Sequence, residues 1–406
     1  MSRTKTGRVA CFYILAFLFV LLLFSESQSI TNHGVIIPFI KFNETYLFLA
    51  IIVCGAIYAL FRYSARFDAI LFLLFGRIFL SLLPMLLYDV PSDYFGNFVI
   101  ACFPFFVYLF FLNVPISTKN TAKIFLFFGV MIALQCFWAY FLILKEGYAA
   151  YNAPYYKDYF VIPAGATNLI SGILLPLLIL GDQIIERRRY RWVYTALLAI
   201  AIFLCKSRTG IVLVVIYFFT KLVIKGRKGR RSGWINLLLI LMPFLVLAVV
   251  LLLLDFEYAK VLREFMLGFA KEGDDLDGVT SGRLTIYRST LQYVFSHHYL
   301  LGNGVSMGNL DYTATHNVFL EILYQNGLVG LVGFVAFLVL FVRTIYRKRN
   351  ADYCIAAFGV ALPFIFLNAL FEDTMICEFM ILFGFAFLAA ARQQDNTNGG
   401  IENVQG

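Results

Sequence analysis

Four side chains have the types and positions that phosphate binding and proton transfer need. Lys206 and Arg208 lie in a four-residue polar break between two apolar runs, Arg283 lies in a long polar segment, and His316 directly precedes the next apolar run. Arginine binds phosphate with a planar fork and stays charged at any working pH. Histidine can accept or orient a hydroxyl proton near neutral pH. These residues therefore predict a site for an anionic, phosphate-bearing substrate.

Each of these residues also has a purely structural interpretation. Lys206 and Arg208 can place their charges among lipid headgroups, Arg283 can lie on a helix surface, and His316 can be an interfacial residue beside a helix cap. Three further candidates are weaker and are kept as secondary site residues: Arg288, Asn317 and Arg77. Arg77 lies inside an apolar run, where a charged side chain is a functional candidate by default.

The elements that position these residues must be membrane helices. Of the 406 residues, 61% are apolar and 14% are charged, and the mean hydropathy is +0.81. Soluble chains average about 45–50% apolar and about 25% charged residues, so the composition excludes a soluble enzyme. Long, continuous apolar runs in lipid must be helices, because the backbone then satisfies its own hydrogen bonds. The sequence predicts an all-α, polytopic membrane helix bundle.

We interpret the apolar runs as about twelve transmembrane helices, each near the length that crosses a bilayer. The expected spans are Val9–Phe24, Thr45–Phe61, Ala69–Leu87, Asn97–Leu112, Ala122–Leu144, Thr167–Gly181, Trp192–Cys205, Gly210–Ile224, Ile235–Leu254, His316–Val342, Tyr353–Phe371 and Met375–Ala391. Four regions follow from these spans. Residues 1–254 hold helices one to nine, 255–315 form one large loop on the outer side, 316–391 hold helices ten to twelve, and 392–406 form a disordered cytoplasmic tail.

Charge asymmetry sets the expected orientation. Most of the 33 Lys and Arg residues fall in alternate connecting segments, which places both termini in the cytoplasm. Lys206, Arg208 and the large loop then lie on the outer side. Within that loop, apolar residues at helical spacing predict amphipathic helices over Glu257–Lys271 and Arg283–Phe295. We expect Glu372 and Asp373, in the last outer turn, to be solvated.

Other classes of site receive little support. The net charge of +9 is spread over short clusters between apolar runs, so we expect no nucleic-acid partner. The seven cysteines form no CxxC pair, and the segment from Gly302 to Gly308 lacks the Gly-Lys-Ser/Thr of a phosphate-binding P-loop. We expect no metal ion and no cofactor.

The order of short motifs resembles one family. A Ser-Arg pair at a short outer turn is followed by Ser-Gly-Arg in a large loop, then Gly-x-Gly, His-Asn at the start of a span, and Gly-Leu-x-Gly. Here these motifs are Ser207-Arg208, Ser281-Gly282-Arg283, Gly302-Asn303-Gly304, His316-Asn317 and Gly327-Leu328-Val329-Gly330. Over roughly Cys205 to Val335, the chain is similar to the O-antigen ligase and O-antigen polymerase superfamily of bacterial polysaccharide assembly.

The resemblance implies a membrane glycosyltransferase of the GT-C-like architecture that needs neither a metal nor a nucleotide sugar. Its donor would be an undecaprenyl-diphosphate-linked glycan at the periplasmic face of the inner membrane. By resemblance, Arg208 and Arg283, with Lys206 beside them, would hold the diphosphate, and His316 would meet the acceptor hydroxyl. The implied partners are membrane lipids, an acceptor that is a lipid-linked repeat unit or lipid A core, and other polysaccharide-assembly proteins.

Three functions stay open at this point. A polymerase would transfer the growing chain to a lipid-linked repeat unit, and a ligase would transfer the finished chain to lipid A core. A transporter or flippase of lipid-linked oligosaccharide belongs to another class and predicts internal repeats, which the sequence lacks. We favour the polymerase.

Overall fold

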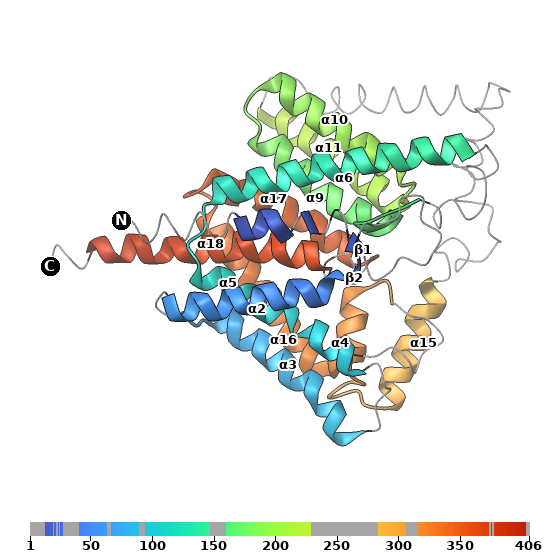
Figure 1. Ribbon diagram of the computed structural model, residues 1–406, viewed down its shortest axis with the longest axis vertical. Helices are drawn as coiled ribbons and strands as arrows, with labels where there is room; N and C mark the ends of the chain where they lie inside the picture. The colour runs from blue at the N-terminus through green and yellow to red at the C-terminus, as the bar shows by residue number, and fades with distance from the viewer. Residues whose placement is uncertain are drawn as a thin grey trace. The chain divides into compact units, whose positions relative to one another are not determined.

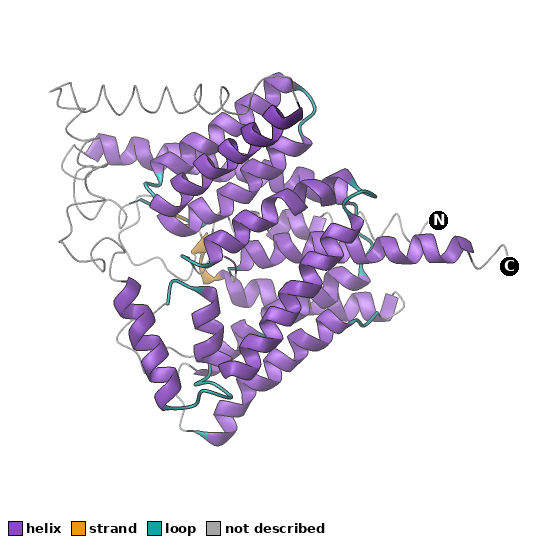
Figure 2. Ribbon diagram, turned by 180° about the vertical axis from the view of Figure 1, so that it is seen from behind, coloured by secondary structure: helices purple, strands orange, loops and turns teal. Residues whose placement is uncertain are grey.

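The computed structural model describes residues 13–18, 20–21, 23, 25–26, 40–62, 66–88, 94–146, 160–228, 283–305, 315–372, 375 and 377–402. Contacts divide the chain into two units, one formed by residues 1–211 with 294–406 and the other by residues 212–293. Figure 2 shows that the described chain is almost entirely helical. The expectation of an all-α, polytopic membrane protein is confirmed.

The first unit contains most of the helices (Figure 1). Along the chain they are α2 (Glu44–Arg62), α3 (Ala69–Leu87), α4 (Tyr94–Ala101), α5 (Phe103–Asn113), α6 (Thr118–Glu146), α9 (Thr167–Ile184), α10 (Arg188–Leu204), α16 (Val318–Lys348), α17 (Tyr353–Ala369) and α18 (Glu378–Glu402). Two further helices, α11 (Arg208–Lys228) and α15 (Arg283–Ser296), have residues in both units. The strands are short: β1 (Ser25–Glu26) pairs with β2 (Ile40–Asn43), and β3 (Val161–Ile162) pairs with β4 (Gly165–Ala166).

Among the described residues, five helical segments are long and apolar enough to cross a membrane: Ala69–Leu87, Tyr94–Asn113, Thr118–Lys145, Thr167–Ile184 and Val318–Lys348. Two shorter apolar helices cover Leu49–Phe61 and Tyr353–Ala369. The predicted span Ile235–Leu254 and the predicted helix Glu257–Lys271 lie outside the described residues. The count of twelve therefore stays a prediction, as do the four regions.

Side-chain caps fix where several helices begin. Asp68 accepts a hydrogen bond from Leu71 N at 2.9 Å at the start of α3, and Asp352 accepts one from Cys354 N at 2.7 Å at the start of α17. Both starts agree with the predicted spans. The same carboxylates also join helices, because Tyr108 of α5 donates to Asp68 and Thr118 of α6 donates to Asp352, each at 2.6 Å. These caps lock helix ends together where the backbone would otherwise leave donors unpaired.

Aromatic side chains fill the core between α6, α17 and α18. Phe125 meets Phe383 edge to face with ring centroids 4.6 Å apart, and Phe358 stacks on Phe387 at 4.8 Å. Such pairs add to the packing that holds membrane helices together. Elsewhere in this unit, α9 packs against α10 and α17, α5 against α2 and α18, and α16 against α3.

The structure adds detail to the expected spans. The expected span Asn97–Leu112 lies within one apolar helical segment, Tyr94–Asn113, which comprises α4 and α5. Cys102 between them keeps helical dihedral angles, and Pro104 lies in the first turn of α5, where proline is tolerated. The span His316–Val342 begins at Val318 and is interrupted at Gly327, whose φ of 64° and ψ of −166° are not helical. Gln393, in the predicted tail 392–406, lies in α18, and its side-chain nitrogen donates to carbonyls at the end of α5, including Val114 O at 2.7 Å.

Contacts between helix ends agree with the predicted alternation of sides. Asp68 lies 3.5 Å from Arg392, and both were assigned to the same side. At the opposite ends of these helices, Tyr88 stacks on His298 with ring centroids 3.8 Å apart, and His316 pairs with Glu372. Residues assigned to one side therefore contact residues assigned to that side. Which side faces the cytoplasm stays a prediction.

Candidate functional site

The turn between α10 and α11 presents Lys206 and Arg208 on a rigid base. Ser207 is fully buried and its hydroxyl accepts a hydrogen bond from Gly210 N at 3.3 Å, which caps α11. A Cβ at Gly210 would lie 2.7 Å from the Cβ of Ser171 on α9, so only glycine fits there. Arg208 is then the first residue of α11 and is half-buried.

Lys206 has an unusual backbone and an unusual environment. Its φ is 50°, in the left-handed region, which costs a non-glycine residue roughly 1–2 kcal/mol. Burial lowers the pKa of the Lys206 ammonium below its ordinary value, because desolvation disfavours the charged form. Lys206 and Arg208 also stand at a helix N-terminus, where the helix dipole disfavours cations and favours anions. An anionic ligand would offset both costs, and this arrangement therefore favours binding of a phosphate group.

The His316-Asn317 pair forms the start of α16. Asn317 caps the helix, because its side-chain oxygen accepts hydrogen bonds from Phe319 N at 3.0 Å and Leu320 N at 3.1 Å. Its side-chain nitrogen donates to Leu370 O at 3.1 Å and so ties this helix start to the end of α17. Asn317 thus has a structural role that accounts for its position.

His316 itself has φ of 52° and is held by a carboxylate. Its Nδ1 lies 3.6 Å from Oε2 of Glu372, whose side chain is 6% exposed, whereas the imidazole is 39% exposed. The expectation that Glu372 is solvated is wrong. One indication of this pair was present in the sequence: an acidic residue and a histidine both fall in segments predicted to lie on the outer side. At this distance the carboxylate can stabilise positive charge that develops on the ring, which suits a histidine that accepts a proton.

Arg283 and Arg288 lie on α15. The helix begins at Arg283 and ends at Ser296, in agreement with the helix predicted over Arg283–Phe295. Arg283 is half-buried and Arg288 is exposed. Both lie in the second unit, whereas Lys206, Arg208 and His316 lie in the first. The convergence of Arg208, Arg283 and His316 on one substrate therefore stays a prediction.

The two glycine motifs interlock. At the interruption of α16, Asn303 N donates to Tyr324 O at 2.8 Å and Gly304 N donates to Gln325 O at 2.9 Å. In return, Leu328 N donates to Tyr299 O at 2.8 Å. These bonds pair backbone donors and acceptors that the interruption of α16 leaves without partners inside the helix.

Only glycines allow this backbone crossing. A Cβ at Gly302 would lie 2.5 Å from Gly327 N, and a Cβ at Gly327 would collide with Leu300 O. Both glycines also have positive φ. The motifs Gly302-Asn303-Gly304 and Gly327-Leu328-Val329-Gly330 are thus structural, and they fix the loop that precedes His316 to the half-helix that follows it.

The structure also supplies a partner for Arg77. Its Nη2 lies 3.5 Å from Oε1 of Gln325 on α16, and the side-chain nitrogen of Gln325 donates to Glu321 Oε1 at 3.0 Å. Arg77 Nε is buried and makes no hydrogen bond. Among the described residues, no group of three or more His, Cys, Asp or Glu side chains could hold a metal ion.

The fold and this site define a class: an all-α polytopic membrane protein with cationic and imidazole side chains where helices begin. Residues 193–335 match the family model O-Antigen ligase, and the predicted resemblance to the O-antigen ligase and polymerase superfamily is confirmed for that region. The match includes Lys206, Arg208, Arg283 and His316. It supports a membrane glycosyltransferase-like function of the ligase or polymerase type in O-antigen assembly. No curated protein matches the chain.

Proposed function

We propose that the protein is a polysaccharide polymerase that transfers an undecaprenyl-diphosphate-linked glycan chain to a lipid-linked repeat unit. The reaction takes place at the periplasmic face of the bacterial inner membrane. It requires no nucleotide sugar, because the diphosphate donor is already activated, and the resemblance to the family implies that it requires no metal ion.

The proposed step is a single glycosyl transfer. The acceptor hydroxyl oxygen attacks the anomeric carbon of the donor sugar, and the bond from that carbon to the diphosphate oxygen breaks. The hydroxyl proton passes to His316, and undecaprenyl diphosphate leaves. Arg208, Arg283 and Lys206 stabilise the negative charge that grows on the leaving oxygens, which lowers the barrier most if they are fixed before the reaction.

One observation carries the proposal. His316 lies within the region matched by the O-antigen ligase family, is held in a left-handed backbone conformation, and is paired with the buried carboxylate of Glu372. Backbone strain and a buried acid next to a histidine are costs that functional sites retain. The capped start of α11, with Arg208 in its first turn, supplies the matching cationic element.

A ligase remains the second candidate, because the same residues would serve an acceptor on lipid A core. The surface polysaccharide of a deletion strain distinguishes the two on a gel. A single repeat on the core indicates a polymerase, and unsubstituted core with long lipid-linked chains indicates a ligase. Purified protein that moves lipid-linked sugar across vesicles without forming a glycosidic bond would instead indicate a flippase.

Substitution of the arginines tests the site. Arg208→Ala and Arg283→Ala should each lower polymer formation about 100- to 1,000-fold, the loss typical of one fixed charge-stabilising group. Both variants should remain in the membrane at wild-type amounts. Arg189→Ala, at an exposed position at the start of α10, is the matched control and should leave polymer unchanged. Normal polymer in both site variants would refute the diphosphate assignment.

A further inference from the structure

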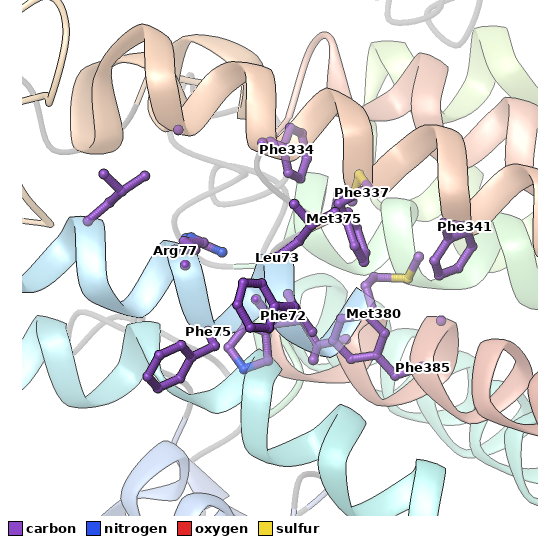
Figure 3. Close-up of a pocket in the computed structure, with 18 of the residues that line it drawn as sticks. Phe72, Leu73, Phe75, Arg77, Phe334, Phe337, Phe341, Met375, Met380 and Phe385 are labelled. Carbon is purple, nitrogen blue, oxygen red and sulfur yellow. The ribbon is translucent and has the colours of Figure 1, made fainter. Parts of the chain in front are cut away.

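Two adjoining cavities lie along α3, α16 and α18. The larger, of about 510 Å³, is lined almost entirely by apolar side chains and glycines (Figure 3), among them Phe72, Phe337 and Phe385. The smaller, of about 300 Å³, contains most of the polar side chains: Asn97, Glu321, Gln325 and Glu378. Arg77, Pro104 and Ile381 line both. An apolar cavity and a polar cavity thus meet at a guanidinium group.

The guanidinium of Arg77 is incompletely satisfied. Its contact with Gln325 is 3.5 Å long, at the limit of a hydrogen bond, and its buried Nε has no partner. A buried donor without an acceptor is costly, and a charge inside a membrane helix is costlier still. Figure 3 shows Arg77 towards one end of the apolar cavity, with Phe341 and Phe385 towards the other. The vacant donor marks the place where an acceptor atom of a ligand would lie.

The polar cavity has the chemistry of a hydroxyl-rich group. Two carboxylates and two amides can accept and donate hydrogen bonds in several directions, which suits a sugar ring. Arg77 is the one cation among the described lining residues of either cavity, so a phosphate group is expected at Arg77 and the uncharged sugar beside Glu321 and Glu378.

We propose that the two cavities form one binding site for a glycolipid, with its hydrocarbon chain in the apolar cavity, its sugar in the polar cavity, and the linking phosphate oxygen on Arg77 Nε. Polymerisation needs two lipid-linked substrates, and this site would hold one of them. The identification of the ligand as a prenyl-diphosphate-linked sugar rests on the proposed function. The site itself rests on the cavities and on Arg77.

Two glycines allow the site to be blocked without disturbing the fold. Gly333 on α16 and Gly76 on α3 line the apolar cavity, and a Cβ at either meets no protein atom within 4 Å. Leucine at these positions would therefore occupy the space of the ligand chain. Leucine is also a better helix former than glycine, so folding should not suffer. Val332→Leu is the matched control, since Val332 is the neighbour of Gly333, is 63% exposed and does not line the cavity.

Photolabelling of the full-length protein in lipid nanodiscs tests the proposal. The probe is undecaprenyl-diphosphate-linked N-acetylglucosamine with a diazirine in its prenyl chain. Labelling should fall on α3, α16 and α18, drop about tenfold in Gly333→Leu and in Gly76→Leu, and stay at the wild-type level in Val332→Leu. Wild-type labelling of these helices in both leucine variants would overturn the proposal.

Two further arms identify the ligand and separate this site from the proposed function. Excess phosphatidylglycerol should not displace the probe, and equal competition by that phospholipid would overturn the assignment to a glycolipid. Arg77→Met should reduce labelling about tenfold, and retained labelling would remove Arg77 from the site. Labelling that depends on Gly333 in a protein that forms no polymer would refute the polymerase and leave the glycolipid site intact.

Discussion

The start of α11 and the start of α16 are built from the same backbone device. Among the described residues, the two non-glycine residues with positive φ are Lys206 and His316, and each directly precedes the residue that caps its helix. In each case a residue with left-handed backbone is followed by a side-chain cap. The sequence thereby places an ionisable group beside each helix N-terminus.

The two helix starts differ in how the ionisable group is stabilised. Desolvation lowers the pKa of Lys206, so the fold disfavours its charge. His316, in contrast, has the buried carboxylate of Glu372 at 3.6 Å, which favours positive charge on the imidazole. The first arrangement suits a cation that an anionic ligand completes, and the second suits a group that gains a proton during the reaction. In the proposed reaction, one local design would thus serve both binding and proton transfer.

Among the substitutions that test the difference between the two helix starts, Glu372→Gln should have the largest effect on the rate of polymer formation. The substitution keeps the shape of the side chain and removes the charge that supports His316. Glycosyl transfer should slow about 10- to 100-fold, within the range that proton-transfer groups contribute. The measurement is the rate of polymer formation by membranes with equal amounts of protein.

Glu186→Gln, at an exposed position between α9 and α10, is the matched control and should not change the rate. A rate for Glu372→Gln equal to that of the control would show that the ion pair has no part in the reaction. The starts of α11 and α16 would then not differ in function.

Removal of the two helix caps should lower the stability of the protein by different amounts, which is a smaller effect than that of Glu372→Gln on the rate. Asn317→Ala removes two accepted hydrogen bonds and the bond to Leu370 O, and should lower the free energy of unfolding by about 2 kcal/mol. Ser207→Ala removes one long hydrogen bond and should cost about 0.5–1 kcal/mol. Denaturant unfolding in one detergent, followed by circular dichroism, measures both.

Asn317→Asp keeps the accepting oxygen and should recover most of the loss at α16. Equal losses in the two alanine variants would contradict the difference that the hydrogen bonds imply.

Local signals predicted much of this architecture. The bounds Ala69–Leu87 were predicted from hydropathy and agree with α3, since an apolar run bounded by a capping aspartate defines a helix by itself. The junction at His316 and Asn317 was predicted in the same way. The interruption at Gly327 was not, because a change in backbone direction leaves the apolar character of the run unchanged.

Pairs distant in the sequence could not be predicted. Arg77 and Gln325 are 248 residues apart in the sequence, and the hydropathy of α3 and α16 does not indicate which residues contact each other. Glu372 was expected to be solvated because polar residues in a turn usually are, but it is buried where the end of α17 meets the start of α16. The ionisable groups could therefore be predicted from the local sequence, whereas their environments depend on tertiary contacts that it does not show.

Glycine at the two positions with positive φ should raise the stability of the protein slightly, whereas loss of the caps lowers it. Lys206→Gly and His316→Gly remove the strain of a positive φ, partly offset by the entropy that glycine loses on folding, for a net gain of about 0.5 kcal/mol each. Both variants should lose polymer formation. Thermal unfolding of the purified variants measures the gain, and a lower melting temperature in Lys206→Gly would show that its side chain contributes more to stability than the strain costs.

The smallest effect should be a change of pH dependence in Lys206→Arg. The lowered pKa of Lys206 means that its charge, and with it a share of diphosphate binding, is lost at a lower pH than for an exposed lysine. Arginine stays charged, so the alkaline fall in activity should move to higher pH in the variant, while the activity near neutral pH changes little. Rates from about pH 6 to about 10.5, the usual pKa of lysine, would show the shift. Superimposable profiles would show that the charge of Lys206 does not contribute to the reaction, and the start of α11 would then act through Arg208 alone.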